Sequence, residues 1–130
     1  MYSKFQNKFL TADNQKRAFI NTQKIKTLWF NTGTLCNLAC KGCYIDSSPK
    51  NDRLAYLSID EFKSFVNESI QNKMGTEQIG FTGGEPFMNR DIFKMIKYSL
   101  ENGFKTLVLT NAMKPMLNNK NELFRLNHLN

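Results

Sequence analysis

The sequence predicts an α/β fold in which short parallel strands alternate with helices. Three runs of β-branched, aliphatic and aromatic residues are separated by two stretches in which apolar residues recur at helical spacing. The units follow one another at about 30 residues, as parallel βαβ units do. A cysteine-rich or polar motif follows each run, and ligands bind at the carboxyl ends of the strands in such folds. The predicted order is therefore βαβαβ, followed by a weaker helix.

The first run, Thr27–Asn31, predicts a buried strand that ends near Gly33. A loop with all the cysteines and a polar stretch follow it. We expect the first helix to begin after Ser58, because Ser58 and Glu61 have the spacing of a capping box. Gly75 suits its end. Its apolar face is formed by Ile59, Phe62, Phe65, Val66 and Ile70.

The second strand is predicted at Gln78–Thr82, directly before the turn Gly83-Gly84-Glu85-Pro86. A second helix is expected to begin near Asn89 and to end at Gly103. The third strand, 104–109, ends at Thr110-Asn111, and a weaker helical pattern closes the chain. The phenylalanines at helical spacing are expected in the core rather than in a cofactor site; these are Phe62, Phe65 and Phe93. The second helix is expected to bury Ile92, Phe93, Ile96 and Leu100, and the last pattern consists of Leu117, Leu123, Phe124 and Leu126.

The length of 130 residues and a hydrophobic fraction of 41% favour one globular domain and exclude a disordered chain. The net charge is +7, but most of it lies in residues 1–35, which hold six basic residues and one acidic residue. We therefore divide the chain into a basic N-terminal extension, 1–26, and a main domain, 27–130. The extension is either a loose arm or a short element packed on the domain. Its aromatic residues form no platform for single-stranded nucleic acid, so no nucleic-acid partner is expected.

The three cysteines, Cys36, Cys40 and Cys43, all lie in one loop. An odd number cannot be fully paired within the chain, which argues against the disulfide framework of a secreted protein. Residues 1–10 lack the apolar stretch of a signal peptide, and no apolar run has the length of a membrane span. We therefore expect a cytoplasmic protein without a membrane partner.

The cysteines have the spacing C-x3-C-x2-C, which lets three thiolates surround one face of a small metal centre. A structural zinc ion and an ordinary cubane cluster each require four ligands. The other candidate soft ligand, His128, lies far along the chain. The loop thus suggests an iron–sulfur cluster with one iron open to a small molecule. A structural zinc site or plain buried thiols is the alternative, because short cysteine motifs are not specific alone.

Together, these motifs resemble those of the radical S-adenosylmethionine (SAM) superfamily over about residues 27–115. The cysteine loop matches its C-x3-C-x2-C signature, and Gly83-Gly84-Glu85-Pro86 matches its GGEP motif at the end of the second strand. Thr110-Asn111 is similar to the Thr-Asn pair at the end of the third strand. The motifs occur in the family's order with the expected elements between them.

The resemblance implies that Cys36, Cys40 and Cys43 ligate three irons of a [4Fe-4S] cluster and that SAM chelates the fourth. An electron from a reductant such as flavodoxin or ferredoxin would cleave SAM to methionine and a 5'-deoxyadenosyl radical. That radical would abstract hydrogen from a substrate that the sequence does not identify. The cofactors carry this chemistry, and the protein binds, orients and excludes water. No side chain is therefore expected to be a general acid or base.

In this interpretation the carbonyls of Gly83 and Gly84, with the Glu85 carboxylate, accept hydrogen bonds from the ammonium group of SAM. Without the cysteines, the same residues would predict only a glycine turn between strand and helix. Gly42 stands where the family often has an aromatic residue, so Tyr44 or the backbone would contact adenine. Ala112 likewise stands where glycine is common.

Two further alternatives stay open at this stage. Thr110 and Asn111 either contact SAM or substrate, or they satisfy backbone groups at the strand end. The resemblance implies a partial parallel (β/α)6 barrel of which this chain holds about three units, the N-terminal half of a radical SAM core domain. The chain is then a piece of a longer enzyme or a short protein completed by association. The alternative function is a small zinc- or cluster-stabilised binding module that contacts RNA through its basic extension.

Overall fold

The structure, a computed structural model, describes residues 7–21, 24–54 and 56–127. A parallel sheet of three strands forms its centre, in the order β1 (Thr27–Asn31), β2 (Gln78–Thr82) and β3 (Lys105–Val108). Trp29 lies opposite Gly80, and Gly80 lies opposite Leu107. The predicted α/β class and parallel sheet are confirmed, and they are consistent with a partial βα barrel. His128 lies outside the described residues.

The helices follow the strands as expected, with differences at their ends. They are α1 (Ile59–Gln71), the 3-10 helix η1 (Pro86–Met88), α2 (Ile92–Glu101), α3 (Lys114–Leu117) and α4 (Lys120–Leu126). The predicted capping box is confirmed, because the Ser58 N–H donates to Glu61 Oε2 at 2.9 Å while Ser58 Oγ accepts from the Glu61 N–H. Helix α1 ends before Gly75, since Lys73 already takes a left-handed conformation with φ 50°.

The structure differs from the sequence-based expectations about the helices at three points. Helix α2 begins at Ile92 rather than near Asn89, because residues 86–88 form a tighter 3-10 turn first. The final pattern forms two short helices that separate at Asn118 and Asn119, which are poor helix formers. Phe65 is 56% exposed and not in the core. Its ring lies at the rim of the core, 6.3 Å from that of Phe30 between centroids.

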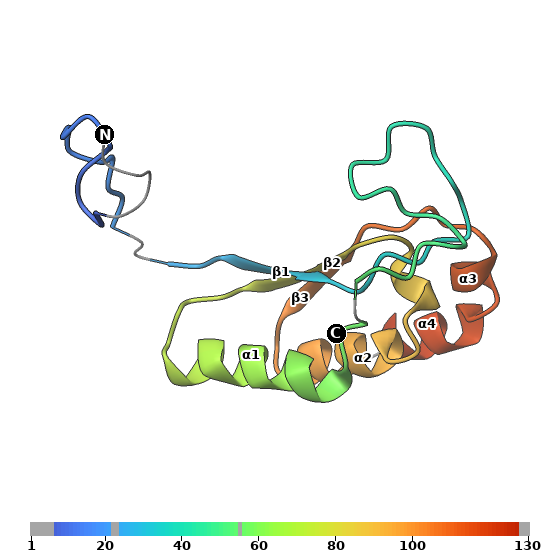
Figure 1. Ribbon diagram of the computed structural model, residues 1–130. Coiled ribbons are helices and arrows are strands. Elements are labelled where there is room, and N and C mark those ends of the chain that lie inside the picture. Colours follow the sequence, from blue (N-terminus) through green and yellow to red (C-terminus); the bar gives the residue numbers. More distant parts are fainter. Residues whose placement is uncertain (1–6, 22–23, 55, 128–130) are drawn as a thin grey trace.

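The core lies between one face of the sheet and helices α1 and α2, which Figure 1 shows below the strands. Alternate residues of a strand point to the same face, so Phe30, Ile79 and Phe81 face these helices. The rings of Phe30 and Phe62 meet edge to face at 4.6 Å between centroids. Burying such side chains stabilises the fold by about 1.5–3 kcal/mol each. The remaining core residues include Val66, Ile92, Met95, Ile96, Leu100, Phe104 and Leu126.

The opposite face of the sheet carries apolar side chains that remain open to solvent. Trp29, Leu107 and Leu109 are 49%, 40% and 52% exposed. In a closed parallel barrel this face is turned inward and filled with side chains. Helices α1 and α2 thus cover the face of the sheet that is the outer face in such a barrel, and the face that would be inside remains open.

The basic extension and the cysteine loop lie at opposite ends of the sheet (Figure 1). The Ile25 N–H donates to the Met74 carbonyl at 2.9 Å, and Lys24 pairs with Glu77 just before β2. Residues 7–21 contain no helix or named strand, and Phe9, Phe19 and Ile20 are exposed. This segment forms an isolated bridge between Leu10 and Lys16 and extends away from the helices of the main domain (Figure 1). Among the described residues, no helix is long and apolar enough to cross a membrane.

Candidate functional site

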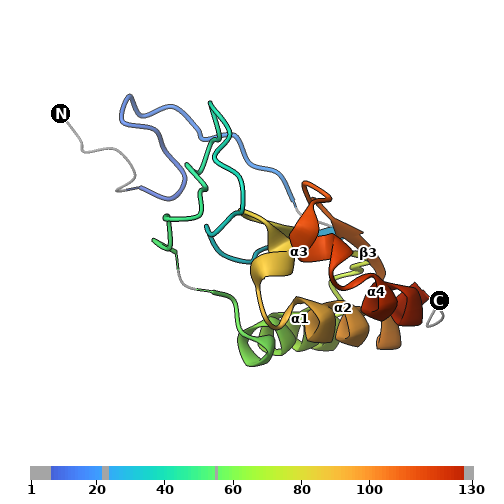
Figure 2. The same ribbon diagram turned by 90° about the vertical axis from the view of Figure 1, so that its right-hand side faces the viewer.

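The carboxyl ends of the three strands bring the sequence motifs together at one end of the sheet, which faces the viewer in Figure 2. Beyond β1 and β2 the two backbones stay paired as they turn. The Gly84 N–H donates to the Gly33 carbonyl at 2.8 Å, and the Glu85 N–H donates to the Leu35 carbonyl at 3.0 Å. The turn of the GGEP motif is therefore bonded directly to the chain that leads into the cysteine loop.

The two glycines of this turn are required by the backbone that surrounds them. Gly83 has φ 133°, a conformation that favours glycine. At Gly84, an added Cβ would lie 2.3 Å from the Leu35 carbonyl oxygen and 2.6 Å from that of Thr34. Both obstacles are backbone atoms, which cannot rotate away. The motif thus allows two turns to approach within hydrogen-bond distance.

We expect Gly84→Ala to lower the free energy of unfolding by about 1–3 kcal/mol, because the new methyl group must push the two turns apart. Urea denaturation followed by circular dichroism measures this change. Gly103→Ala is the comparison, since Gly103 has φ 78° and no atom within 4 Å of an added Cβ, so its loss of stability reports backbone strain without a clash. A Gly84→Ala variant as stable as the wild type would show that the close approach at Gly84 does not require glycine.

The Glu85 carboxylate is buried, with 1% of the residue exposed, and it joins three segments. It accepts hydrogen bonds from the Phe87 N–H at 3.1 Å, from the Thr110 hydroxyl at 2.8 and 2.9 Å, and from the Asn111 N–H at 2.9 Å. These donors are all neutral. The carboxylate therefore fixes the end of β3 against the turn that follows β2.

Asn89 is a second buried polar residue that joins two segments, and in the sequence it indicates only the start of a helix. Its side chain is 3% exposed, and its Nδ2 group donates to the carbonyls of Thr32 at 3.0 Å and Leu57 at 2.9 Å. It thereby connects the turn after β1 to the segment before α1. A single asparagine between a turn and a helix belongs to no periodic pattern, so local sequence patterns do not predict this role.

The cysteine loop is closed at its base and open at its tip. Leu35 and Ser48 form an isolated bridge, and the Cys36 N–H donates to the Ser48 carbonyl at 3.2 Å. Within the loop, the Cys43 N–H donates to the Cys40 carbonyl at 3.2 Å. All three thiols are free of disulfides; Cys36 is buried, Cys43 is half-buried and Cys40 is exposed.

Two of the sulfur atoms are surrounded by hydrogen-bond donors. Cys36 Sγ accepts from the Leu38 N–H at 3.5 Å and from Asn111 Nδ2 at 3.6 Å. The N–H groups of Ile45 and Ser47 lower the pKa of the Cys43 thiol below its usual value, because they stabilise the thiolate. The buried Ser47 hydroxyl lies near this sulfur but makes no hydrogen bond of ordinary geometry within the described part of the chain.

The loop does not gather the three thiols into a finished metal site. In the described residues, no three side chains of His, Cys, Asp or Glu converge closely enough to hold a metal ion. Tyr44 is 80% exposed at the tip of the loop and is not packed on the Gly83-Gly84 turn. The donor chemistry thus fits an iron–sulfur cluster, whereas the loop has to rearrange to bring the three sulfurs together.

Thr110 and Asn111 both point into the network rather than into solvent. Asn111 Nδ2 donates to Asn37 Oδ1 at 2.9 Å as well as to Cys36 Sγ. The next residue, Ala112, takes φ 57°, which explains why glycine suits this position. Asn37, Leu38 and Ser47 were not singled out from the sequence, because their roles depend on contacts formed only when the loop meets the strand ends.

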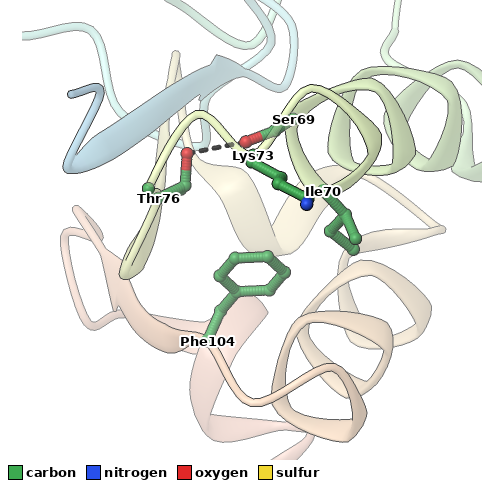
Figure 3. Close-up of a pocket in the computed structure, with 6 residues that line it drawn as sticks. Ser69, Ile70, Lys73, Thr76 and Phe104 are labelled. Atoms are coloured by element: carbon green, nitrogen blue, oxygen red, sulfur yellow. Dashed lines mark hydrogen bonds between the residues drawn. The ribbon is translucent and has the colours of Figure 1, made fainter. Parts of the chain in front are cut away.

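A cavity of about 170 Å³ lies away from this site, at the amino end of the strands (Figure 3). Ser69, Lys73 and Phe104 are among its lining residues. The hydroxyls of Ser69 and Thr76 satisfy one another at 2.7 Å. Residues at this end of parallel α/β folds serve stability rather than chemistry. The cavity is therefore separate from the candidate site.

Comparison with known families and proteins agrees with the geometry. The family model described as "Radical SAM superfamily" matches residues 30–128. An S-adenosylmethionine-dependent nucleotide dehydratase of Selenomonas ruminantium is 33% identical over 65% of this chain and 29% of its own length. The subtilosin biosynthesis protein AlbA of Bacillus subtilis is 37% identical over 59% of this chain and 16% of its own length. A GTP 3',8-cyclase of Actinobacillus pleuropneumoniae is 35% identical over 58% of this chain and 22% of its own length.

The chain spans less than a third of the length of these relatives. The three relatives are named as two enzymes and a biosynthesis protein. None of the three is named as an RNA-binding module.

Proposed function

Because this chain belongs to the radical SAM superfamily, we propose that it forms the part of a radical SAM enzyme that binds a [4Fe-4S] cluster and SAM. The observation that carries this proposal is the position of the three free cysteines. They lie on the loop that leaves β1, and the base of that loop is hydrogen-bonded to the Gly83-Gly84 turn after β2. Three cysteines leave one iron open, which is what a cofactor that binds directly to the cluster requires.

In this proposal Cys36, Cys40 and Cys43 hold the cluster. The surroundings of Cys36 and Cys43 support this assignment, since N–H groups already point at both sulfurs. The buried Ser47 hydroxyl supports it as well, because it lies near the Cys43 sulfur and has no hydrogen-bond partner of ordinary geometry among the described residues, whereas buried polar groups normally have one. Cys40 is exposed and can move, and metal sites are seldom fully formed before the metal binds.

When bound, the cluster and SAM supply the chemistry: an electron from a reductant such as flavodoxin or ferredoxin cleaves SAM to methionine and a 5'-deoxyadenosyl radical, which abstracts hydrogen from substrate. The chain's own contribution is to bind and orient. We assign the carbonyls of Gly83 and Gly84 as acceptors for the SAM ammonium group. Glu85 holds these carbonyls in place, since its carboxylate is occupied by protein donors. Tyr44 remains a candidate adenine contact if the loop closes.

We further propose that residues 27–130 are the N-terminal half of a radical SAM core domain and that residues 1–26 are a basic extension to it. Two observations support this division. The chain covers only a small share of the length of its relatives. The uncovered sheet face also exposes Trp29 of β1 and Leu107 of β3 on either side of Gly80, with Leu109 just beyond β3, and apolar patches of this kind are normally buried by further structure.

The RNA-binding alternative is not supported. The relatives reported above are enzymes or a biosynthesis protein, and the basic extension lies at the end of the sheet opposite the cysteine loop (Figure 1). These relatives include a nucleotide dehydratase and a GTP 3',8-cyclase, so they support a shared use of SAM but do not indicate one substrate for this chain.

The test is anaerobic reconstitution of the chain with iron and sulfide. We expect a brown protein with about four irons per chain, and an electron paramagnetic resonance (EPR) signal of the reduced cluster that changes when SAM is added. Formation of 5'-deoxyadenosine in the presence of a reductant tests the cleavage separately. Bound zinc with no iron would overturn the proposal in favour of a structural zinc site.

A further inference from the structure

The side-chain amide of Asn111 is held in one orientation by the residues around it. Its Oδ1 atom accepts from the Met113 N–H at 3.0 Å, and its own backbone N–H donates to Glu85 Oε2 at 2.9 Å. An amide oxygen that accepts on one side leaves the Nδ2 group, which only donates, on the other. The network therefore determines which way the amide points.

The Nδ2 group points at the cysteine loop. It donates to Cys36 Sγ at 3.6 Å and to Asn37 Oδ1 at 2.9 Å. Cys36 is 7% exposed, so this contact is shielded from water, and the sulfur's other donor is the Leu38 N–H. A residue at the end of β3 thus contacts a sulfur that lies 75 positions earlier in the chain.

We propose that Asn111 is a positioning residue that donates an N–H···S hydrogen bond to the ligand sulfur of Cys36 and thereby raises the reduction potential of the cluster. This inference rests on the proposed function, since it requires the cluster. Hydrogen bonds to the sulfurs are one of the features that set the potential of an iron–sulfur cluster. Reduction adds negative charge that is shared by the sulfur ligands. The donor therefore stabilises the reduced form more than the oxidised form.

This role differs from direct contact with SAM or substrate, because the donor group of Asn111 is already used within the protein. It also gives Glu85 a connection to the cluster. The carboxylate holds the Asn111 backbone, and the Asn111 side chain holds the sulfur.

The experiment compares the reconstituted wild-type chain with Asn111→Ala, Asn111→Asp and Met113→Ala, all without SAM. The midpoint potential is measured by redox titration monitored by EPR. We expect both Asn111 variants to have more negative potentials, with reduction disfavoured about tenfold, which corresponds to about 59 mV for one electron. Asn111→Asp keeps an acceptor for the Met113 N–H but removes the donor and adds a negative charge, so its potential should be at least as negative as that of Asn111→Ala. Met113→Ala keeps the backbone N–H that holds Asn111 and changes only an exposed side chain, so it should keep the wild-type potential.

The outcomes separate this inference from the proposed function. If the wild-type chain takes up no iron, the proposed function fails. If all four proteins take up equal iron and have equal potentials, the cluster assignment stands and the role of Asn111 is wrong. If only the Asn111 variants lose iron, the contact to Cys36 serves to retain the cluster, and the proposed effect on the potential is overturned. Loss of iron in Met113→Ala as well would assign the loss to packing of the turn after β3 and would also overturn the inference.

Discussion

Replacing Cys40 with alanine is expected to abolish the [4Fe-4S] cluster while leaving the stability of the apoprotein almost unchanged. Cys40 is exposed and contributes no core packing, and exposed substitutions usually change the free energy of unfolding by less than about 0.5 kcal/mol. A cluster with one iron open to SAM has only three cysteine ligands, so the loss of one leaves two. Iron content and the visible absorbance of the reconstituted protein measure the first effect, and urea denaturation of the apoprotein measures the second.

Alanine substitutions of Cys36 and Cys43 should also abolish the cluster, but their effects on the stability of the apoprotein should differ from that of Cys40→Ala. Cys36 is 7% exposed beside two N–H donors, so Cys36→Ala should also destabilise the apoprotein. Lys41→Ala is the matched control in the same exposed part of the loop and should retain the iron. A full complement of iron in Cys40→Ala would contradict the assignment of the three ligands.

Replacing Glu85 with alanine is expected to cost about 3–5 kcal/mol of folding free energy, a large part of the total stability of a small domain. The substitution leaves the Phe87 N–H, the Asn111 N–H and the Thr110 hydroxyl without their acceptor. Each unsatisfied buried donor costs about 1–3 kcal/mol. Denaturation in urea measures the loss, provided that the variant is soluble.

Glu85→Gln is the conservative variant, because its amide oxygen still accepts hydrogen bonds. Its amide nitrogen cannot accept, so at least one of the surrounding donors loses its partner. We expect an intermediate loss of stability. Glu68→Ala, at an exposed position of α1, should remain close to wild type. If Glu85→Ala were as stable as Glu68→Ala, the buried carboxylate would not be what joins β3 to the turn after β2.

Local patterns in the sequence predicted most of the fold. The capping box at Ser58 and the periodic apolar residues of α1 and α2 depend on neighbours within one helix turn, and the structure confirms them. The same local signals failed at Phe65 and at the break between α3 and α4. Burial at the rim of a helix depends on what packs beside it, and short helices depend on tertiary contacts.

The sequence by itself determined the class of the fold, the order of its elements and the meeting of three motifs at one sheet edge. These follow from periodicity, from turn residues and from the rule that parallel strands end on the same side. Only the tertiary structure decided how the motif residues are used. Glu85 is buried under donors from β3, and Asn111 reaches Cys36 across 75 positions. Such contacts depend on strand register and on the close approach of two turns, which no local pattern encodes.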